Sequence, residues 1–303
     1  MKANMDMDKT SKRQSPYLLL VIGVIAVSTA AIMIKVALSS ASPIAVAFHR
    51  LFFSAIIAIL ILFSTKKQAK IEISKDLFGL LILSGVLLSL HFAAWIWSLD
   101  LVSVSSSVIF VTTSPLWVGL LSPLILKERV PGRFYVGVLF ALAGGLLIAL
   151  LGNNSDGSNT LPGLLMALFS AWMVAGYLLI GRKVAGKLST ELYVSIVYSI
   201  AAIVLGTLML FIEKGYQSYS PRIYLIFLLL ALVPQTLGHT SFNKALTHFP
   251  ARTVSLALLF EPVGSSLLAI LFLKELPSGI EIAGGILILI GLFIALSAKP
   301  NEV

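Results

Sequence analysis

Apolar residues follow one another along this chain in long stretches, separated by short gaps that carry charged residues, Pro or Gly. A bilayer core is about 30 Å thick and an α-helix rises about 1.5 Å per residue, so one crossing needs about 20 residues. The stretches do not alternate in polarity, as strands of a membrane β-barrel do. The pattern predicts an all-α protein with ten transmembrane helices, at 16–37, 44–63, 77–99, 102–126, 132–151, 161–181, 190–212, 222–243, 251–273 and 278–297.

Composition agrees with a chain that needs lipid as solvent. The 303 residues are 58% hydrophobic and 12% charged, and the mean hydropathy is +1.00. The formal charge of +9 lies in the short gaps rather than on one helix face, so it indicates topology and not nucleic-acid binding. Cys is absent from the sequence, which excludes disulfides, thiol catalysis and thiolate metal sites. We therefore predict no metal and no cofactor.

The distribution of Lys and Arg predicts the orientation of the helices. Most of the 22 basic residues lie in alternate gaps, and the gaps between them hold only Lys214, Arg222 and Lys274. Since Lys and Arg are retained on the cytoplasmic side, both termini are predicted to be cytoplasmic. The expected location is the inner, or plasma, membrane of a bacterium.

An internal repeat occurs at a constant offset of 147 residues. The offset pairs Pro115 with Pro262, Lys127–Glu128 with Lys274–Glu275, Gly132 with Gly279, Gly137 with Gly284, Gly144 with Gly291, Lys35 with Arg182 and Ser42 with Ser189. Five helices per repeat is an odd number, so the second copy is expected upside down, as in many secondary transporters. The predicted parts are a tail (1–15), a first repeat (16–151), an extracytoplasmic linker (152–160), a second repeat (161–297) and a tail (298–303).

Two segments carry a resemblance to a known family. Thr113-Ser-Pro-Leu-Trp-Val-Gly with Leu126-Lys-Glu-Arg-Val, and its echo from Glu261-Pro-Val-Gly to Leu273-Lys-Glu, resemble the repeat signature of the drug/metabolite transporter superfamily, EamA-type branch. The resemblance implies a ten-helix carrier with a central cavity between its halves, moving amino acids or related metabolites, often outward. The first repeat departs from the second by having Ser114 where the second has Glu261.

Polar side chains within the spans are the candidates for chemistry, because a charge at the centre of a membrane helix costs about 2.5–3.5 kcal/mol on insertion scales. Glu261 lies near mid-depth, where it suits a proton relay or a site for a substrate ammonium, or a structural bond to a neighbouring helix. Pro262 beside it and Pro115 in the mirrored span free backbone carbonyls, so both are predicted hinges or cavity-lining residues rather than tolerated kinks.

In the eighth span Gln235, His239 and Asn243 recur every four residues just past Pro234, a third predicted hinge. That spacing puts them on one helical face, which must contact protein or water. The stripe is either a substrate track or a seam of interhelical hydrogen bonds. His239, together with Glu261, is a candidate for proton coupling.

Further candidates for the cavity wall lie in other spans. They are His91 and Trp95 in the third span, Thr112 and Ser114 in the fourth, and Trp172 and Tyr177 in the sixth. For Trp95 and Trp97, proximity to the outer interface favours an aromatic belt over a pocket wall. His49 and Arg50 lie close in depth to Lys35 and Asp100, which favours an ion network at the outer rim over an electrostatic entrance for anionic solutes.

These features favour a secondary transporter over two alternatives. It would move a small metabolite, an amino acid or related compound, by alternating access and in the outward direction. An integral membrane enzyme acting on a lipid-like substrate would need clustered acids, His or basic residues, and the sequence has no phosphate loop, His-Glu-x-x-His pair or nucleophile elbow. A channel would be distinguished by conductance without saturation. The expected partners are the lipid bilayer, a small-molecule substrate and, if coupled, protons.

Overall fold

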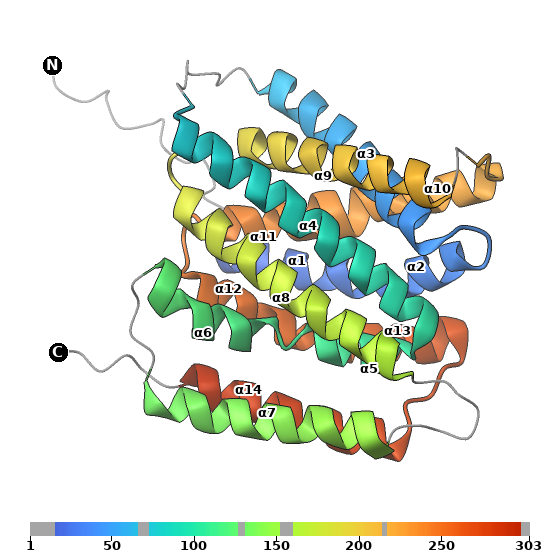
Figure 1. The fold of residues 1–303 in the computed structure, drawn as a ribbon, viewed down its shortest axis with the longest axis vertical. Helices are drawn as coiled ribbons and strands as arrows, with labels where there is room; N and C mark the ends of the chain where they lie inside the picture. Colours follow the sequence, from blue (N-terminus) through green and yellow to red (C-terminus); the bar gives the residue numbers. More distant parts are fainter. Residues whose placement is uncertain (1–15, 66–72, 127–130, 152–159, 214–216, 298–303) are drawn as a thin grey trace, which may run out of the picture.

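The computed structural model describes residues 16–65, 73–126, 131–151, 160–213 and 217–297. Its regular elements are all helical, and their long axes run roughly side by side (Figure 1). The tails, residues 152–159 of the predicted linker, and the Lys127–Glu128 part of the repeat match lie outside the described residues.

The elements follow the predicted spans, several of which are interrupted. Those of the first repeat are α1 (Pro16–Ser28), α2 (Ala30–Leu38), α3 (Pro43–Ser64), α4 (Lys75–Leu101), α5 (Val104–Val111), α6 (Ser114–Ile125) and α7 (Gly132–Leu151). Those of the second are α8 (Leu161–Val184), α9 (Thr190–Ile212), α10 (Pro221–Leu230), the π-helix η1 (Ala231–His239), α11 (Thr240–Ala245), α12 (Ala251–Ala257), the 3₁₀ turn η2 (Leu258–Phe260), α13 (Glu261–Leu273) and α14 (Gly279–Ser297).

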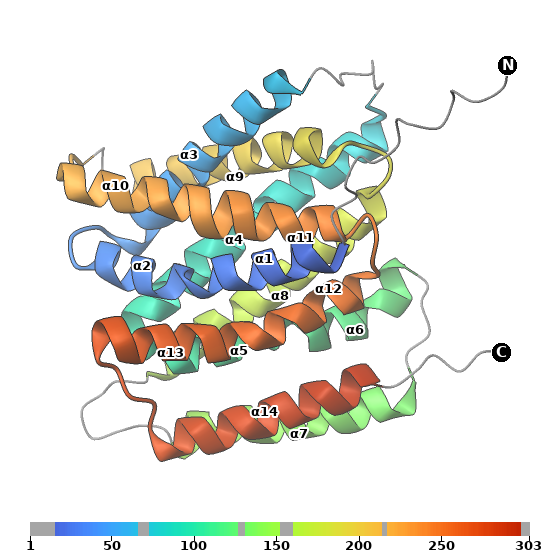
Figure 2. The ribbon, with the colours of Figure 1, turned by 180° about the vertical axis from the view of Figure 1, so that it is seen from behind.

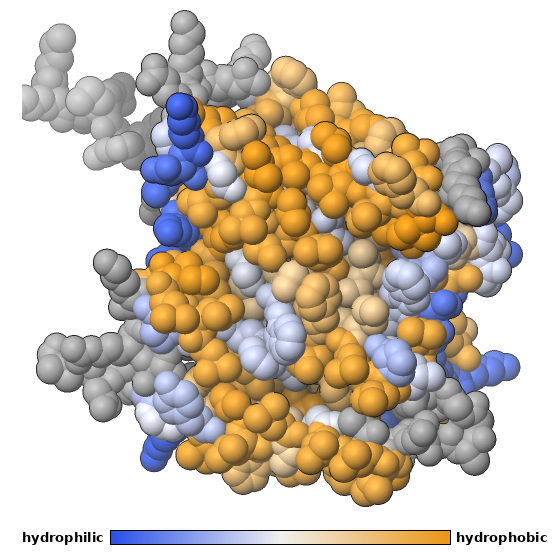
Figure 3. Space-filling view, viewed as in Figure 1, coloured by the Kyte–Doolittle hydropathy of each residue, from blue (hydrophilic) through white to orange (hydrophobic). Residues whose placement is uncertain are grey.

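Length and composition make the chain a polytopic membrane protein. Within the described ranges, eight helices or helix series are long and apolar enough to cross a bilayer, namely Pro16–Leu38, Pro43–Ser64, Lys75–Leu101, Val104–Ile125, Leu161–Val184, Thr190–Ile212, Pro221–Ala245 and Thr253–Leu273. Two shorter apolar helices, Gly132–Ile148 and Gly279–Ala295, would complete ten, a number that stays a prediction. Apolar side chains cover most of the face in Figure 3, and hydrophilic ones gather at its two lateral edges. This distribution suits lipid contact.

The two repeats interleave rather than sit side by side. α4 of the first repeat packs against α8 of the second, and α1 of the first packs against η1 of the second. The offset of 147 residues carries α1 onto α8 and α4 onto η1, so the two contacts are equivalent. They lie on opposite faces of the molecule, with α4 and α8 in front in Figure 1 and α1 in front in Figure 2.

α7 and α14, which correspond to each other in the repeat, run antiparallel along one edge of the bundle (Figures 1 and 2). A Cβ atom added at Gly137 would meet the backbone of Gly291, and one added at Gly144 would meet the backbone of Gly284. The offset maps each of these contacts onto the other, as a two-fold axis requires. The small residues let the backbones touch, as in other membrane helix pairs. The flat glycine face therefore serves packing within the bundle.

Local structure at the helix ends is also repeated. Ser42 caps α3 by accepting from the Ala45 amide at 3.1 Å, and Ser189 caps α9 by accepting from the Leu192 amide at 3.2 Å. The cations at corresponding positions bind corresponding helix ends. Lys35 Nζ donates to the carbonyl of Val102 after α4 (3.0 Å), and Arg182 Nη1 donates to that of Leu246 after α11 (2.7 Å). Both bonds suit the negative end of a helix dipole.

The fourth span of each repeat is broken at the same place. α6 begins at Ser114 and α13 at Glu261, and the following prolines, Pro115 and Pro262, occupy the first turn. A proline there is tolerated because its missing N–H would have no partner in the helix. In the first repeat the hydroxyl of Thr112 donates to the carbonyls of Val108 and Ile109 at 2.8 and 3.1 Å, which satisfies part of the broken backbone. Neither proline lies in a helix interior, so both mark breaks rather than kinks.

Pro234 lies inside η1, where the backbone winds wider than an α-helix. The Thr236 hydroxyl donates to the carbonyl of Ala231 at 2.7 Å, and Ser54 Oγ reaches the same carbonyl at 3.4 Å. These hydroxyls therefore give polar partners to the backbone at the start of the wide turn. The corresponding part of the first repeat is an uninterrupted stretch of α4.

The glycine contact between α7 and α14 generates a stability prediction. Gly144→Ala should destabilise the protein by about 1–3 kcal/mol, because the methyl group overlaps the α14 backbone. Gly79→Ala in α4 is the matched control: it meets nothing within 4 Å and should stabilise by about 0.5–1 kcal/mol through helix propensity. The measurement is the thermal midpoint of each variant in detergent. Equal midpoints for the two variants would show that the helices do not touch there.

Candidate functional site

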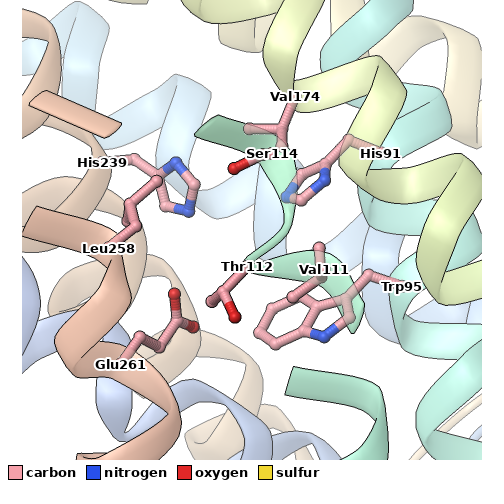
Figure 4. A pocket seen from close by; sticks show the side chains of 9 residues that line it. All are labelled: His91, Trp95, Val111, Thr112, Ser114, Val174, His239, Leu258 and Glu261. Atoms are coloured by element: carbon pink, nitrogen blue, oxygen red, sulfur yellow. The ribbon is translucent and has the colours of Figure 1, made fainter. Parts of the chain in front are cut away.

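A pocket lies in the interior, where elements from both repeats meet. Its lining residues are His91, Trp95, Val111, Thr112, Ser114, Val174, His239, Leu258 and Glu261. They come from α4, the broken fourth span, α8, η1, η2 and α13, and their side chains surround one space in Figure 4. All of them are buried except His239, which is partly exposed. The pocket is therefore nearly closed in this conformation.

The pocket lies between corresponding positions of the two repeats. The offset of 147 pairs Val111 with Leu258 and Ser114 with Glu261, and all four side chains line it. Phe92, whose counterpart is His239, packs against that ring with 5.2 Å between centroids. Since residues related by a two-fold axis can lie close together only near the axis, the pocket lies near the axis that relates the repeats.

Both broken spans resume as helices at the pocket. Ser114 and Glu261 are the first residues of α6 and α13, and neither helix has a side-chain cap. The Glu261 amide donates to the carbonyl of Leu258, that of Leu116 donates to Thr113, and Pro115 and Pro262 have no N–H, so these helix starts offer the pocket few free N–H groups. Glu261, only 7% exposed, supplies a carboxyl group at one of them.

Hydrogen-bond donors without a partner line the same space. Ser114 Oγ and Trp95 Nε1 are buried and have no hydrogen-bond partner among the described residues. The hydroxyl of Thr112, by contrast, is occupied by backbone carbonyls. An unpartnered buried donor costs about 1–3 kcal/mol, so a ligand with acceptor atoms would remove a penalty. In the part of the chain that the structure describes, no three His, Cys, Asp or Glu side chains gather as a metal site.

Packing holds the imidazole of His91 in place. Its Nδ1 lies 2.8 Å from Ser170 Oγ and 3.1 Å from the Ser170 carbonyl, and its ring stacks on that of Trp95 at 6.1 Å. The ring of His239 lies 6.2 Å away. Trp95 is only 3% exposed, whereas Trp97 is 41% exposed. The outer aromatic belt therefore suits Trp97, and the ring of Trp95 belongs to the interior.

The eighth-span stripe does not form one track. Gln235 Oε1 accepts from Arg50 Nε at 3.0 Å, His239 faces the pocket, and Asn243 Nδ2 donates to the hydroxyl of Tyr177 at 2.5 Å. Gln235 and Asn243 therefore bond to residues of α3 and α8, as in the seam of interhelical hydrogen bonds that was the second alternative, and only His239 of the three lines the pocket.

The structure therefore brings six of the ten predicted cavity residues together and separates four. His91, Trp95, Thr112, Ser114, His239 and Glu261 line the pocket. Gln235 and Tyr177 are buried elsewhere, and Trp172, 40% exposed, packs edge-on against Trp117 at 5.2 Å. Asn243 lines a second pocket of about 240 Å³ with Tyr193 and Gly181, near the turn between α8 and α9.

The expected ion network of His49 and Arg50 at the outer rim is wrong. Arg50 is fully buried, and its Cζ lies 4.0 Å above the ring of Phe92. His49 stacks on Phe227 with 4.5 Å between centroids. Position along a span locates a Cα atom, but a long Arg side chain carries its charge several ångströms away. The signal for Arg50 was its charge inside a span, which calls for a functional explanation.

Comparison with known proteins agrees with this architecture. Over 199 residues the chain is 30% identical to the uncharacterized transporter YwfM of Bacillus subtilis, covering 65% of each chain. Over 240 residues it is 26% identical to the pseudopaline exporter CntI of Pseudomonas aeruginosa, covering 79% of this chain and 82% of that one. A solved crystal structure of another protein has the same fold, with a TM-score of 0.68, 18% identity and coverage of 92% and 96% of the two chains.

Apolar spans, broken helices and an interior pocket between two repeats define the class: this is a membrane transporter and not an enzyme. The sequence pattern of the EamA-like transporter family matches residues 14–150 and again residues 161–297. The chain belongs to that family, and each match covers one repeat.

The contacts of His91 generate a prediction about the pocket wall. Ser170→Ala should destabilise the protein by about 1 kcal/mol, because a buried hydrogen bond is lost between α8 and α4. Ser199→Ala in α9 removes only a bond to its own helix, so its thermal midpoint should stay near that of the wild type. A Ser170→Ala protein as stable as the Ser199→Ala control would show that the His91 contact contributes nothing.

Proposed function

We propose that this protein is a secondary carrier that moves a small metabolite by alternating access between two inverted five-helix halves. The observation that carries the proposal is the pocket itself, which is lined by mostly buried residues and located between corresponding positions of the two repeats. A site on such an axis can open alternately to either side when the halves exchange conformations. The antiparallel α7–α14 pair supports the inversion, and the two shorter apolar helices would complete ten spans.

The substrate class we propose is an amino acid or a related compound. The pocket offers a carboxyl group at Glu261, donors at Ser114 and Trp95, and apolar walls at Val111, Val174 and Leu258. Glu261 would bind a substrate ammonium or carry a coupling proton, with His239 as the second candidate proton carrier.

Three prolines are the proposed hinges. Pro115 and Pro262 lie where the fourth spans break, and Pro234 lies in η1, so all three interrupt helices around the pocket. Tyr177 and Asn243 lie between the pocket region and the second pocket near the α8–α9 turn. We propose that this pair belongs to the passage toward the cytoplasm. That placement assumes cytoplasmic termini in a bacterial inner membrane, as the Lys and Arg distribution predicts.

Export is the proposed direction. It rests on the similarity to the pseudopaline exporter and on the family resemblance of the repeat segments. A channel would need a continuous open path, whereas the pocket residues are almost entirely buried. Saturable flux in reconstituted vesicles supports the carrier, and conductance without saturation contradicts it.

Proton coupling through Glu261 has a direct test. Wild-type vesicles should accumulate radiolabelled amino acid when a pH gradient is imposed, and Glu261→Gln should lower that accumulation at least tenfold. The amide retains size and hydrogen bonding but cannot exchange a proton. Glu191→Gln, at the first turn of α9, is the control and should accumulate substrate like the wild type. Undiminished gradient-driven uptake by Glu261→Gln would remove Glu261 from coupling.

A further inference from the structure

Arg50 presents an unusual arrangement for an arginine inside a membrane protein. It is fully buried, and its Nε donates to Gln235 Oε1 at 3.0 Å. Its two terminal nitrogens, Nη1 and Nη2, have no hydrogen-bond partner among the described residues. Burying a guanidinium with two free nitrogens is unfavourable unless a partner arrives in another state.

A single layer of aromatic rings separates Arg50 from the pocket. Its Cζ lies 4.0 Å from the centroid of Phe92 and 5.9 Å from that of Trp95. Trp95 lines the pocket, and Phe92 packs against His91 at 4.6 Å and His239 at 5.2 Å. The guanidinium therefore lies next to the ring of a residue that lines the pocket.

Unpartnered donors gather on both sides of this layer. Nη1 and Nη2 of Arg50 and Nε2 of Gln235 lie behind it, and Nε1 of Trp95 and Oγ of Ser114 lie on the pocket side. The nitrogens donate and do not accept, so they cannot satisfy one another. An oxyanion would satisfy several of them at once. The planar guanidinium matches a carboxylate with two parallel hydrogen bonds.

We propose that Arg50 is the residue that recognises the carboxylate of the transported substrate, assisted by Trp95 Nε1 and Gln235 Nε2. The inference rests on the proposed function, because it names one end of the substrate of that same cavity. Glu261 lies across the pocket and takes the cationic end. A zwitterion brings one negative and one positive group, so the buried charges of Arg50 and Glu261 stay balanced. A cationic amide or an amine lacks the carboxylate and does not balance them. Gln235 holds the guanidinium from η1, so binding at Arg50 also acts on the hinge at Pro234.

The test compares carboxylates with their amides in vesicles. The probes are the radiolabelled standard L-amino acids, and the competitors are the same compounds unlabelled and their α-amides. For the amino acid that is transported best, its uptake by wild-type vesicles should be inhibited at least tenfold more strongly by the unlabelled amino acid than by its α-amide. Arg50→Gln should lose that preference. Arg50→Lys should keep a weaker one, because an ammonium group lacks the two parallel N–H donors of the planar guanidinium.

The matched control is Arg182→Gln, which removes another cation within a span, one whose Nη1 already bonds to the Leu246 carbonyl. It should keep the tenfold preference for the acid. Trp95→Phe, which removes only the indole N–H from the layer, should weaken the preference several-fold and serves if the Arg50 variants do not fold. Monodisperse elution and the thermal midpoint report folding.

The outcomes separate the two proposals. Two outcomes overturn the role of Arg50 and leave the carrier standing. One is saturable flux with no preference for the acid. The other is a preference that persists in folded Arg50→Gln or, where that variant fails to fold, in Trp95→Phe. Absence of saturable flux for every probe in the wild type overturns the proposed substrate class, and the role of Arg50 with it. Loss of the preference at Arg50 with retention in Arg182→Gln supports the inference.

Discussion

Hydrocarbon offers no hydrogen-bond partner, and this constraint decides where the chain can depart from the α-helix. Three of the departures lie around the interior pocket: the break at Thr112–Thr113, the π-helix over Ala231–His239 and the 3₁₀ turn over Leu258–Phe260. Threonine hydroxyls donate to backbone carbonyls at the breaks in the fourth and eighth spans. Five of the buried polar atoms that stay unpartnered among the described residues are donors of Arg50, Trp95, Ser114 and Gln235, in or near the pocket wall.

The two repeats share their backbone plan but not their chemistry. Caps at Ser42 and Ser189 and the glycine ridges of α7 and α14 are nearly interchangeable. Around the pocket, however, Glu261 corresponds to Ser114 and His239 to Phe92, so the second repeat places titratable groups where the first has a hydroxyl and a phenyl ring. Two inverted repeats need similar backbones if they are to exchange conformations, whereas a substrate with two different ends needs different side chains on the two sides of the pocket.

Residues whose behaviour depends on local pattern were predictable. Span length, the offset between the repeats, the breaks at Pro115 and Pro262 and the candidacy of Glu261 all follow from neighbours in the sequence and the cost of polarity in lipid. Gln235 and Asn243 were misplaced because they bond to Arg50 of α3 and Tyr177 of α8, partners distant in the sequence. Arg50 was misplaced because its long side chain crosses to Phe92, far along the sequence.

The sequence by itself determined a membrane protein of apolar spans and paired repeats, because hydropathy and periodicity are properties of the chain alone. The tertiary structure decided which polar residues meet, that α7 and α14 pair within one molecule, and that Arg50 lies behind the pocket rather than at a rim. Those outcomes depend on close approach between segments distant in the sequence, where packing and unpaired hydrogen bonds outweigh any local preference.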